Sequence, residues 1–334
     1  MPITSLDVAR RAGVSQPTVS RALRDQRGVS ASTRWRVRQA ARELGYVPIQ
    51  SGRALSTQTT GRVGIVSAEL SNPFYPALIE PLHETLAGLG YRTILVTDRG
   101  DAPIELEPLI DGSLDGVILT TSERSSSLPK ELERRGVPYV LINRQADDIE
   151  ADCCVADNFA GSQDVADFLV RLGHTKIGAI YGPDSTSTGH ERAIGFRQRL
   201  NQLGVSLDDR LIHVGPFTEK TGVEGFSAIY QHRPTAIFCG NDVIALGVRN
   251  AAEATGVRVP ADLTIVGFDD IPMAAWKVFD LTTMRTDLND LASNAVRLLV
   301  ARMGDPERPF DRVVLTPQLV LRGTHAALHT RDKL

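Results

Sequence analysis

Seven short apolar runs constrain the fold of this chain more than any other feature of its sequence. They occur at residues 63–67, 91–96, 116–120, 138–143, 176–182, 235–240 and 263–268. Amphipathic stretches separate many of them, at 75–89, 159–173, 190–203 and 242–256. Near-continuous apolar strands that alternate with helices are typical of parallel sheets covered on both faces. The runs form two sets of about 100 residues each, which predicts two similar α/β lobes.

Length and composition narrow the class of protein. A chain of 334 residues has room for two or three domains. No apolar run approaches the roughly 20 residues of a membrane span, and Asp7, Arg10 and Arg11 interrupt the region where a secretory leader would be apolar. We therefore expect a cytoplasmic protein without membrane contact. The three cysteines and seven histidines follow no metal-ligand spacing, so we expect reduced thiols and neither a metal site nor a cofactor.

Charge is distributed unevenly along the chain. Residues 1–60 contain ten arginines and three acids, a net charge of +7, whereas the chain as a whole carries −3, which leaves −10 for the remainder. A basic segment joined to an acidic body suggests that the segment meets phosphates. On charge alone, a solvated basic face is the alternative.

Three short helices are predicted in the first 47 residues. The pattern Thr4-x-x-Asp7 resembles a capping box and begins the first helix. Gly13 is suited to ending it, because glycine readily adopts positive φ, and Ser15 is a favourable N-cap for the second helix. Helix, tight turn with glycine and helix together form the helix-turn-helix pattern.

The second of these helices carries the candidate DNA contacts. In a helix-turn-helix it enters the major groove, with its first residues on the base edges. Gln pairs with adenine and Arg with guanine through two hydrogen bonds each, whereas Pro17 offers only apolar contact, for instance to a thymine methyl. A small helical bundle without a ligand is the alternative interpretation. The predicted DNA-binding residues of the head are Ser5, Ser15, Gln16, Pro17, Thr18, Ser20 and Arg21.

The segment TSLDVARRAGVSQPTVSRAL, followed by RVRQAARELGYVP, resembles the DNA-binding head of the LacI/GalR family of bacterial transcription regulators. The body continues the resemblance with NPFY, LGHTKIG, ERAIGF, NDVIALG and VGFDD in the family's order. It implies an α/β fold: an N-terminal three-helix helix-turn-helix head and a two-lobed periplasmic-binding-protein-like domain with parallel sheets. It also implies a sequence-specific regulator, commonly a repressor, that binds a pseudo-palindromic operator on double-stranded DNA as a homodimer and responds to a small effector.

The resemblance further implies a division of the chain. The head, the hinge and the effector-binding domain would be residues 1–47, 48–60 and 61–330. The family's chain crosses between the lobes three times, so the implied lobes are about 62–158 with 286–316, and 159–285 with 317–330.

The hinge would fold into a short helix on operator DNA. By motif position Leu55, preceded by Arg53, would insert between base steps in the minor groove, where an apolar wedge bends the duplex. Gly52 stands where the family usually has Ala, and Ile49 where it has Asn. The glycine should weaken the hinge helix by about 1 kcal/mol, and the isoleucine removes a cap.

Polar and aromatic side chains follow the ends of the predicted strands, where open parallel sheets bind ligands. Aromatic rings can stack on the C–H face of a sugar while Arg, Asn and Asp bridge its hydroxyls, although the same groups suit a purine. Asn241 and Asp269 could instead cap helices, and Arg192 could form an ion pair. The resemblance assigns these positions to the family's effector pocket, with His190 standing where a small residue is common. The predicted effector-binding residues are Phe74, Tyr75, His190, Arg192, Phe217, Asn241 and Asp269.

Catalytic patterns are missing from the sequence. GPFTEKT at 215–221 begins like a phosphate-binding loop, but Glu219 occupies the position before Lys220, where glycine is needed. We therefore expect a regulator and not an enzyme. A solute-binding protein for sugar transport and an α/β enzyme acting on sugars stay open as alternatives. A sugar or sugar derivative is the expected effector, with a purine or nucleoside as the alternative.

Overall fold

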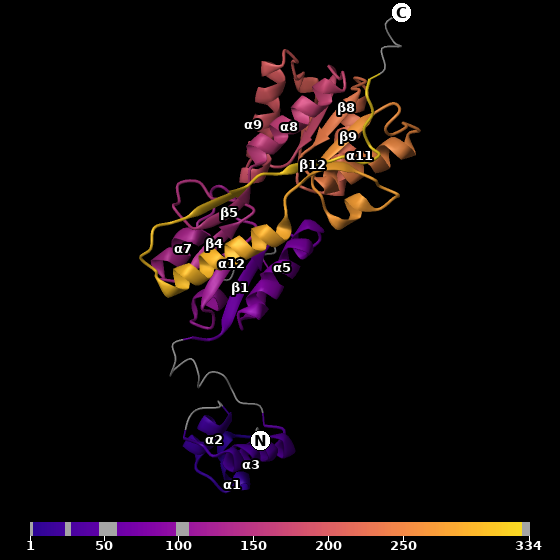
Figure 1. Cartoon of the computed structure of the whole chain (residues 1–334). Helices are drawn as coiled ribbons and strands as arrows, with labels where there is room; N and C mark the ends of the chain where they lie inside the picture. Colours follow the sequence, from indigo (N-terminus) through magenta and orange to yellow (C-terminus); the bar gives the residue numbers. More distant parts are fainter. Residues whose placement is uncertain (1–2, 24–27, 47–58, 98–106, 329–334) are drawn as a thin grey trace, which may run out of the picture. The chain divides into compact units, whose positions relative to one another are not determined.

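The structure is a computed structural model that describes residues 3–23, 28–46, 59–97 and 107–328. The chain divides into two compact units, Met1–Thr60 and Gly61–Leu334 (Figure 1). Each unit has its own hydrophobic core.

The first unit is a bundle of three helices. They are α1 (Ser5–Ala12), α2 (Gln16–Leu23) and α3 (Ala31–Leu44). The backbone N–H and hydroxyl of Thr4 donate to the Asp7 carboxylate at 2.9 and 2.7 Å, which completes the capping box at the start of α1. Gly13 ends α1 with φ 65°. Val8, Val19 and Val37, one from each helix, are fully buried at the centre of this small core.

The second unit contains two six-stranded sheets, one in each lobe. The first sheet has the order β11-β5-β4-β3-β1-β2, and all of its pairs are parallel. Its strands are β1 (Arg62–Ser67), β2 (Arg92–Thr97), β3 (Gly116–Leu119), β4 (Tyr139–Ile142), β5 (Cys153–Ala156) and β11 (Arg312–Leu315). The helices of this lobe are α5 (Phe74–Gly88), α6 (Glu107–Ile110), α7 (Leu128–Arg134) and α12 (Leu288–Gly304).

The second sheet has the order β12-β10-β9-β8-β6-β7, in which only the β12–β10 pair is antiparallel. Its strands are β6 (Ile177–Tyr181), β7 (Ile212–Val214), β8 (Ala236–Cys239), β9 (Thr264–Asp269), β10 (Thr282–Arg285) and β12 (Gln318–Val320). Its helices are α8 (Asn158–Arg171), α9 (Ser187–Gln202), α10 (Glu219–Tyr230) and α11 (Asp242–Ala254), with short 3₁₀ turns at Asp209–Leu211 and Pro272–Ala275.

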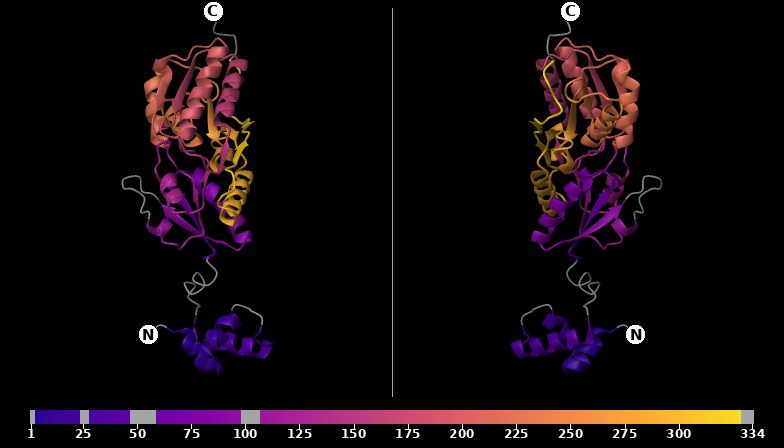
Figure 2. Two further views of the ribbon diagram at one scale, coloured as in Figure 1. Left: turned by 90° about the vertical axis from the view of Figure 1, so that its left-hand side faces the viewer. Right: turned by 90° about the vertical axis from the view of Figure 1, so that its right-hand side faces the viewer.

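Helices cover both faces of each sheet, as both views of Figure 2 show for the second unit. Alternate residues of a strand point to opposite faces, and the core divides accordingly. In β8, Ile237 packs in the cluster that includes α10 and α11, whereas Phe238 packs in the cluster that includes α8 and α9. The near-continuous apolar runs thus reflect burial on both sides, and the predicted α/β fold class is confirmed.

The chain passes between the lobes three times. It leaves the first sheet after β5, returns after β10 to form α12, and crosses again between β11 and β12 (Figure 1). α12 packs against α5 and over β3, β4 and β5, so a late segment completes the early lobe.

None of the helices in the described part of the chain is long and apolar enough to cross a membrane. The described residues also include no group of three or more His, Cys, Asp or Glu side chains that could hold a metal ion.

Two histidines attach the last described segment to the second lobe. The ring of His174 lies 2.9 Å from the Thr235 hydroxyl through Nδ1 and 3.1 Å from the Ala326 carbonyl through Nε2. The Nδ1 of His325 lies 2.8 Å from the Thr282 hydroxyl. Burial lowers the pKa of both imidazoles.

We expect the free energy of unfolding to decrease as the pH falls below about 6.5, the ordinary pKa of histidine. Both rings bind protons more weakly in the folded chain than in the unfolded one. Their contribution to the free energy of unfolding is therefore complete at pH values above the pKa of histidine in the unfolded chain. It is lost as the pH falls toward the lower pKa values of the folded chain. Urea unfolding at pH 7.5, 6.5 and 5.5 measures this dependence. His174→Gln should flatten it, and the same change at the exposed His83 is the control; an unchanged profile in H174Q would contradict the assignment.

Candidate nucleic-acid interface and ligand pocket

Helix α2 presents polar side chains on the face opposite to its buried residues. Val19 and Ala22 point into the core of the head, while Gln16, Pro17 and Arg21 are exposed. This separation follows from the spacing of the two apolar residues, which places them on one stripe of the helix. The first turn of α2 is therefore accessible to a large partner such as a duplex.

Hydrogen bonds organise several of the predicted DNA-binding side chains. Gln16 Nε2 donates to the Ser5 hydroxyl at 2.9 Å, which joins the start of α2 to the start of α1. The hydroxyls of Ser15 and Thr18 lie 2.8 Å apart. Ser20, also predicted, is partly buried on α2.

The surface of the head is strongly cationic. Its described residues include seven arginines but only two acids, Asp7 and Glu43. Asp7 accepts from Thr4 and lies 3.6 Å from Arg10, and Glu43 pairs with Arg11 at 2.6 Å. The remaining positive charge creates a potential that attracts polyanions.

The predicted hinge contacts belong to a segment outside the described residues. Arg53 and Leu55, together with the Ile49 and Gly52 replacements, lie at 47–58, outside the described residues. Their roles stay predictions.

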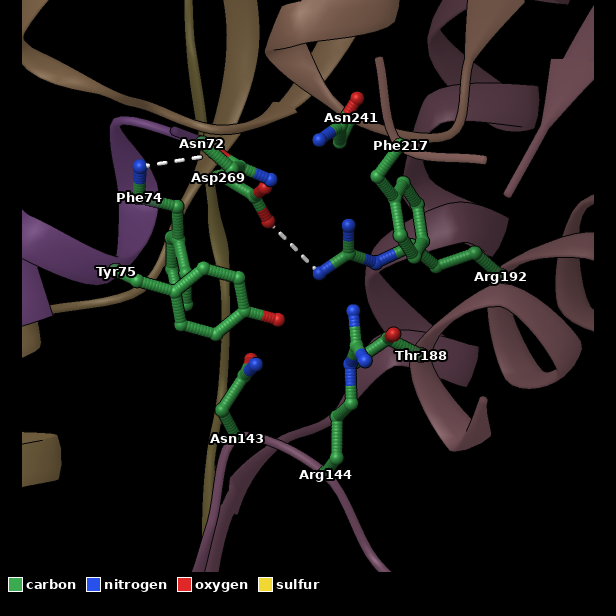
Figure 3. A pocket seen from close by; sticks show the side chains of 10 residues that line it. All are labelled: Asn72, Phe74, Tyr75, Asn143, Arg144, Thr188, Arg192, Phe217, Asn241 and Asp269. Atoms are coloured by element: carbon green, nitrogen blue, oxygen red, sulfur yellow. Dashed lines mark hydrogen bonds and ion pairs between the residues drawn. The ribbon is translucent and has the colours of Figure 1, made fainter. Parts of the chain in front are cut away.

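A pocket lies between the two lobes, at the carboxyl ends of their strands (Figure 3). The unfilled space between its side chains is about 10 Å³, roughly the room of one water molecule. A ligand as large as a sugar ring fits only if these side chains or the lobes move apart. The lining residues are Asn72, Phe74, Tyr75, Asn143 and Arg144 from the first lobe, and Thr188, Arg192, Phe217, Asn241 and Asp269 from the second.

Arg192, on α9, is only 4% exposed and makes four contacts inside the pocket wall. Its Nη2 lies 2.8 Å from Asp269 Oδ1, and its Nη1 donates to the Gly240 carbonyl at 2.7 Å. Its Nε donates to Asn158 Oδ1 at 2.8 Å, and its guanidinium carbon lies 3.8 Å from the centre of the Phe268 ring. Each of the three guanidinium nitrogens therefore has an acceptor in the pocket wall.

Asp269 ends β9 in the left-handed region, at φ 112°. Burial raises the pKa of its carboxyl, and the neighbouring Arg192 opposes that shift. A second carboxyl, Asp242, is fully buried and accepts from the Ile271 N–H at 2.9 Å and from the Thr283 hydroxyl. Burial raises the pKa of Asp242 well above its usual range. Gly267 leaves room for this carboxyl, because a Cβ there would lie 2.2 Å from Asp242 Oδ1.

Asn241 and Phe217 form the upper wall of the pocket in Figure 3. Asn241 is the N-cap of α11, where its Oδ1 accepts from the Ile244 N–H at 2.9 Å. Because the carbonyl oxygen is used in the cap, the amide nitrogen faces the pocket. The Phe217 ring packs on Gly182, where a Cβ would lie 2.1 Å from the ring, so this position requires glycine.

Aromatic rings form the wall of the first lobe. Phe74 and Tyr75 begin α5 in an edge-to-face arrangement with their centroids 5.4 Å apart. Asn72 Oδ1 accepts from the Phe74 N–H at 3.1 Å and fixes the start of the helix. Burial raises the pKa of the Tyr75 hydroxyl, which therefore stays protonated and can donate.

Six of the seven residues predicted for the pocket line it, and His190 does not. Thr188 and Arg192 are four residues apart on α9 and share a face, whereas His190 lies two residues from each and points elsewhere. Its Nδ1 lies 2.6 Å from Asp184 Oδ1 at the surface.

Sequence reasoning missed four lining residues, Asn72, Asn143, Arg144 and Thr188. Asn143 and Arg144 directly follow β4, so the same strand-end argument that selected Asn241 could have found them.

Comparisons with known proteins support both parts of the chain. A model described as bacterial regulatory proteins, lacI family, matches residues 4–48. A model described as periplasmic binding protein-like domain matches residues 166–325.

Full-length relatives are similar over nearly the whole chain. The HTH-type transcriptional regulator MalR of Streptomyces coelicolor is 34% identical in an alignment that covers 96% of each chain. The HTH-type transcriptional repressor CytR of Escherichia coli K12 is 32% identical in an alignment that covers 97% of each chain.

Solved structures agree with the fold. The lac repressor dimer bound to operator and the anti-inducer ONPF superposes with a TM-score of 0.85 at 25% identity, covering 98% of this chain and 100% of that one. The transcriptional regulator CelR in its cellobiose complex has a TM-score of 0.74 at 30% identity, covering 96% and 99%.

The buried pair generates a prediction about stability. Arg192→Met leaves Asp269 buried without its cation and should lower the free energy of unfolding by about 3–5 kcal/mol. Arg197→Met is the control on the same helix, since its ion pair with Asp209 is exposed and worth about 0–1 kcal/mol. Urea unfolding compares the two variants, and equal losses would show that the buried pair is not structurally required.

Proposed function

This chain belongs to the LacI family of bacterial transcriptional regulators, and from that premise we propose that it is a ligand-responsive repressor that binds a pseudo-palindromic operator as a homodimer. As a member of a family of regulators it is not an enzyme. Residues 1–47 form the DNA-binding head, 48–60 the hinge and 61–330 the effector-binding domain, with Arg53 and Leu55 contacting the minor groove. Binding to chromosomal operators places the protein in the cytoplasm, on the nucleoid.

The exposed polar face of α2 carries the DNA-binding proposal. Arg21 can donate two hydrogen bonds to a guanine edge, and Gln16 can donate one to adenine N7 and accept one from adenine N6. Both side chains are exposed on a surface rich in arginine. Ser5, Ser15, Thr18 and Ser20 lie around them and suit phosphate contacts, which fix the register on the duplex. Pro17 contributes apolar contact. This combination separates the chain from solute-binding proteins, whose ligand domain needs no such head.

DNA binding is tested by selecting duplexes from a random library with the full-length protein. The selected site should be an approximate palindrome, and log K should fall linearly with log salt, by about 0.9 for each phosphate contacted. Arg21→Ala should weaken binding by about 1–3 kcal/mol and relax the preference at one base pair of each half-site. Arg135→Ala, an exposed change directly after α7, is the control. A flat salt response, or selection of no duplex, would overturn the proposal.

The homodimer is supported by an exposed apolar edge. Within the part of the chain that the structure describes, β2 is the last strand of its sheet and pairs only with β1. Ile94 and Leu95 on β2 are 39% and 44% exposed. An uncovered apolar edge strand promotes aggregation, so soluble proteins cover such edges. We propose that a second copy covers β2, which brings two heads to two half-sites related by a two-fold axis.

Leu95→Asp should convert the dimer into a monomer, because it introduces two charges into a self-complementary contact. Light scattering after size exclusion measures the mass, and operator affinity should fall with it. Val314→Asp is the matched control, since Val314 is 44% exposed on β11, the opposite edge strand of the same sheet. If the L95D protein stayed dimeric, the proposal that β2 forms the dimer interface would be wrong.

The effector site is proposed to be the pocket between the lobes. Phe74, Tyr75 and Phe217 offer apolar surface, while Arg192, Asn241 and Asp269 offer donors and acceptors for hydroxyls. A sugar-like ligand fits this combination, and the solved relatives include one with cellobiose and one with ribose. Because both lobes line the site, a bound ligand favours one angle between them. Such coupling typically changes DNA affinity by about 1–3 kcal/mol and is reciprocal.

A further inference from the structure

Arg144 is a buried cation in the pocket whose hydrogen-bonding capacity is not used. The residue is 3% exposed, and within the described part of the chain its Nε has no hydrogen-bond partner. Its one ion pair is with Glu69, whose Oε1 lies 3.6 Å from Nη2 and whose side chain is 40% exposed. A buried guanidinium compensated only by a distant, solvated carboxylate is costly, so its retention calls for another partner.

The backbone directs Arg144 into the pocket. Asn143 adopts φ 69°, and the Arg144 N–H donates to the Ile142 carbonyl at 2.8 Å, which makes a three-residue turn directly after β4. The next residue, Gln145, donates its N–H to the Ser187 hydroxyl of the second lobe at 2.9 Å. Strained turns of this kind are found where a side chain must be aimed.

The surroundings of the guanidinium disfavour a flat aromatic ligand. Its carbon lies 5.8 Å from the centre of the Tyr75 ring and 5.6 Å from that of Phe217, so the cation already occupies the space between the rings. Figure 3 shows Arg144 and Arg192 reaching the same space from different lobes, with the Tyr75 hydroxyl beside them. This end of the pocket is therefore rich in donors.

The charge of the lining residues does not balance. Arg144 and Arg192 are cations, and Asp269 is the acid among the ten residues that line the pocket. Asp269 is already paired with Arg192 at 2.8 Å. Arg144 therefore has no acid among the lining residues and only the partly exposed Glu69 outside them, so an anionic ligand group in this site with little water would gain charge-assisted hydrogen bonds.

We infer, on the basis of the proposed function, that the effector is a polyol carrying a phosphate or a carboxylate, that is, a sugar phosphate or a sugar acid. Its anionic group binds Arg144, beside Tyr75 and Arg192, and its hydroxyls bind Asp269 and Asn241. Arg144 thus determines the class of ligand. Because Arg144 belongs to the first lobe, a ligand whose anionic group binds it contacts both lobes.

The test is thermal unfolding of the full-length protein with matched ligands. The probes are glucose, glucose 6-phosphate and gluconate, ribose and ribose 5-phosphate, and inorganic phosphate alone. A ligand that binds only the folded state raises the melting temperature. An anionic member of a set should raise it more than its neutral counterpart at equal concentration, and the phosphate and carboxylate arms identify which anion is bound.

Arg144→Gln should remove that preference and weaken binding of the anionic probe roughly tenfold or more. Arg135→Gln, a matched change of an exposed arginine in the same lobe, should keep it. Without ligand, R144Q should melt at or above the wild-type temperature, because it removes a buried charge that is compensated only by the partly exposed Glu69 carboxylate at 3.6 Å. R144Q melting well below both wild type and R135Q would make Arg144 a structural cation and overturn the inference.

Equal shifts of wild type and R144Q with every probe, including no shift at all, would also overturn it, as would stronger stabilisation by the neutral sugars. These measurements involve no DNA. Failure of the inference therefore leaves operator selection by the same protein intact, whereas failure of operator selection refutes the proposed function and not the ligand preference.

Discussion

The guanidinium of Arg192 joins three parts of the second lobe from one buried position. It binds the Gly240 carbonyl after β8, the Asp269 carboxylate at the end of β9 and the amide oxygen of Asn158, where the chain enters from the first lobe. Stacking on Phe268 adds a fourth contact. Burying this charge is costly, and the cost is offset only because each of these partners is held by the sheet or by a helix start. The shape of the pocket floor depends on this arrangement.

The polar groups of the pocket differ in how firmly they are held before a ligand binds. Arg192 and Asp269 largely neutralise one another, and Asn241 has its oxygen committed to the cap of α11. These groups are fixed before a ligand arrives, which reduces the entropic cost of binding. Arg144 differs, because it comes from the first lobe and lacks a comparable partner. A ligand that satisfies it would add a contact between the lobes and so would stabilise one relative orientation over others.

Much of this architecture follows from local sequence, and the rest depends on pairing between distant segments. The apolar runs at 63–67 and 263–268 became β1 and β9 almost residue for residue, because strands buried on both faces are uniformly apolar. The segment 282–285, Thr-Thr-Met-Arg, became β10 without such a run; its hydroxyls bind partners from elsewhere, as Thr283 does with Asp242. Helix α12 completes the first lobe because it packs against α5, and no local sequence pattern predicts that contact. Strand ends located most of the pocket, but Arg144 became distinctive only once its burial and its unused Nε were known.

Charge serves two different purposes in the chain, and this difference restricts how a ligand can act on DNA binding. Exposed arginines in the head act through a field that salt screens within about 8 Å at physiological ionic strength. The pocket lies at the carboxyl end of β1, and the chain enters the domain at the other end of that strand, six residues and roughly 20 Å away. The ligand's own charge is therefore too distant to reach even the start of the domain through solvent. That start is fixed instead by contacts: the Gly61 N–H donates to Asp115 Oδ2 and its carbonyl accepts from the Arg92 N–H, both at 2.8 Å. When the first lobe moves, residue 61 therefore moves with it. A ligand thus affects the segment before residue 61 through a change in the angle between the lobes, and not through a change in electrostatic potential.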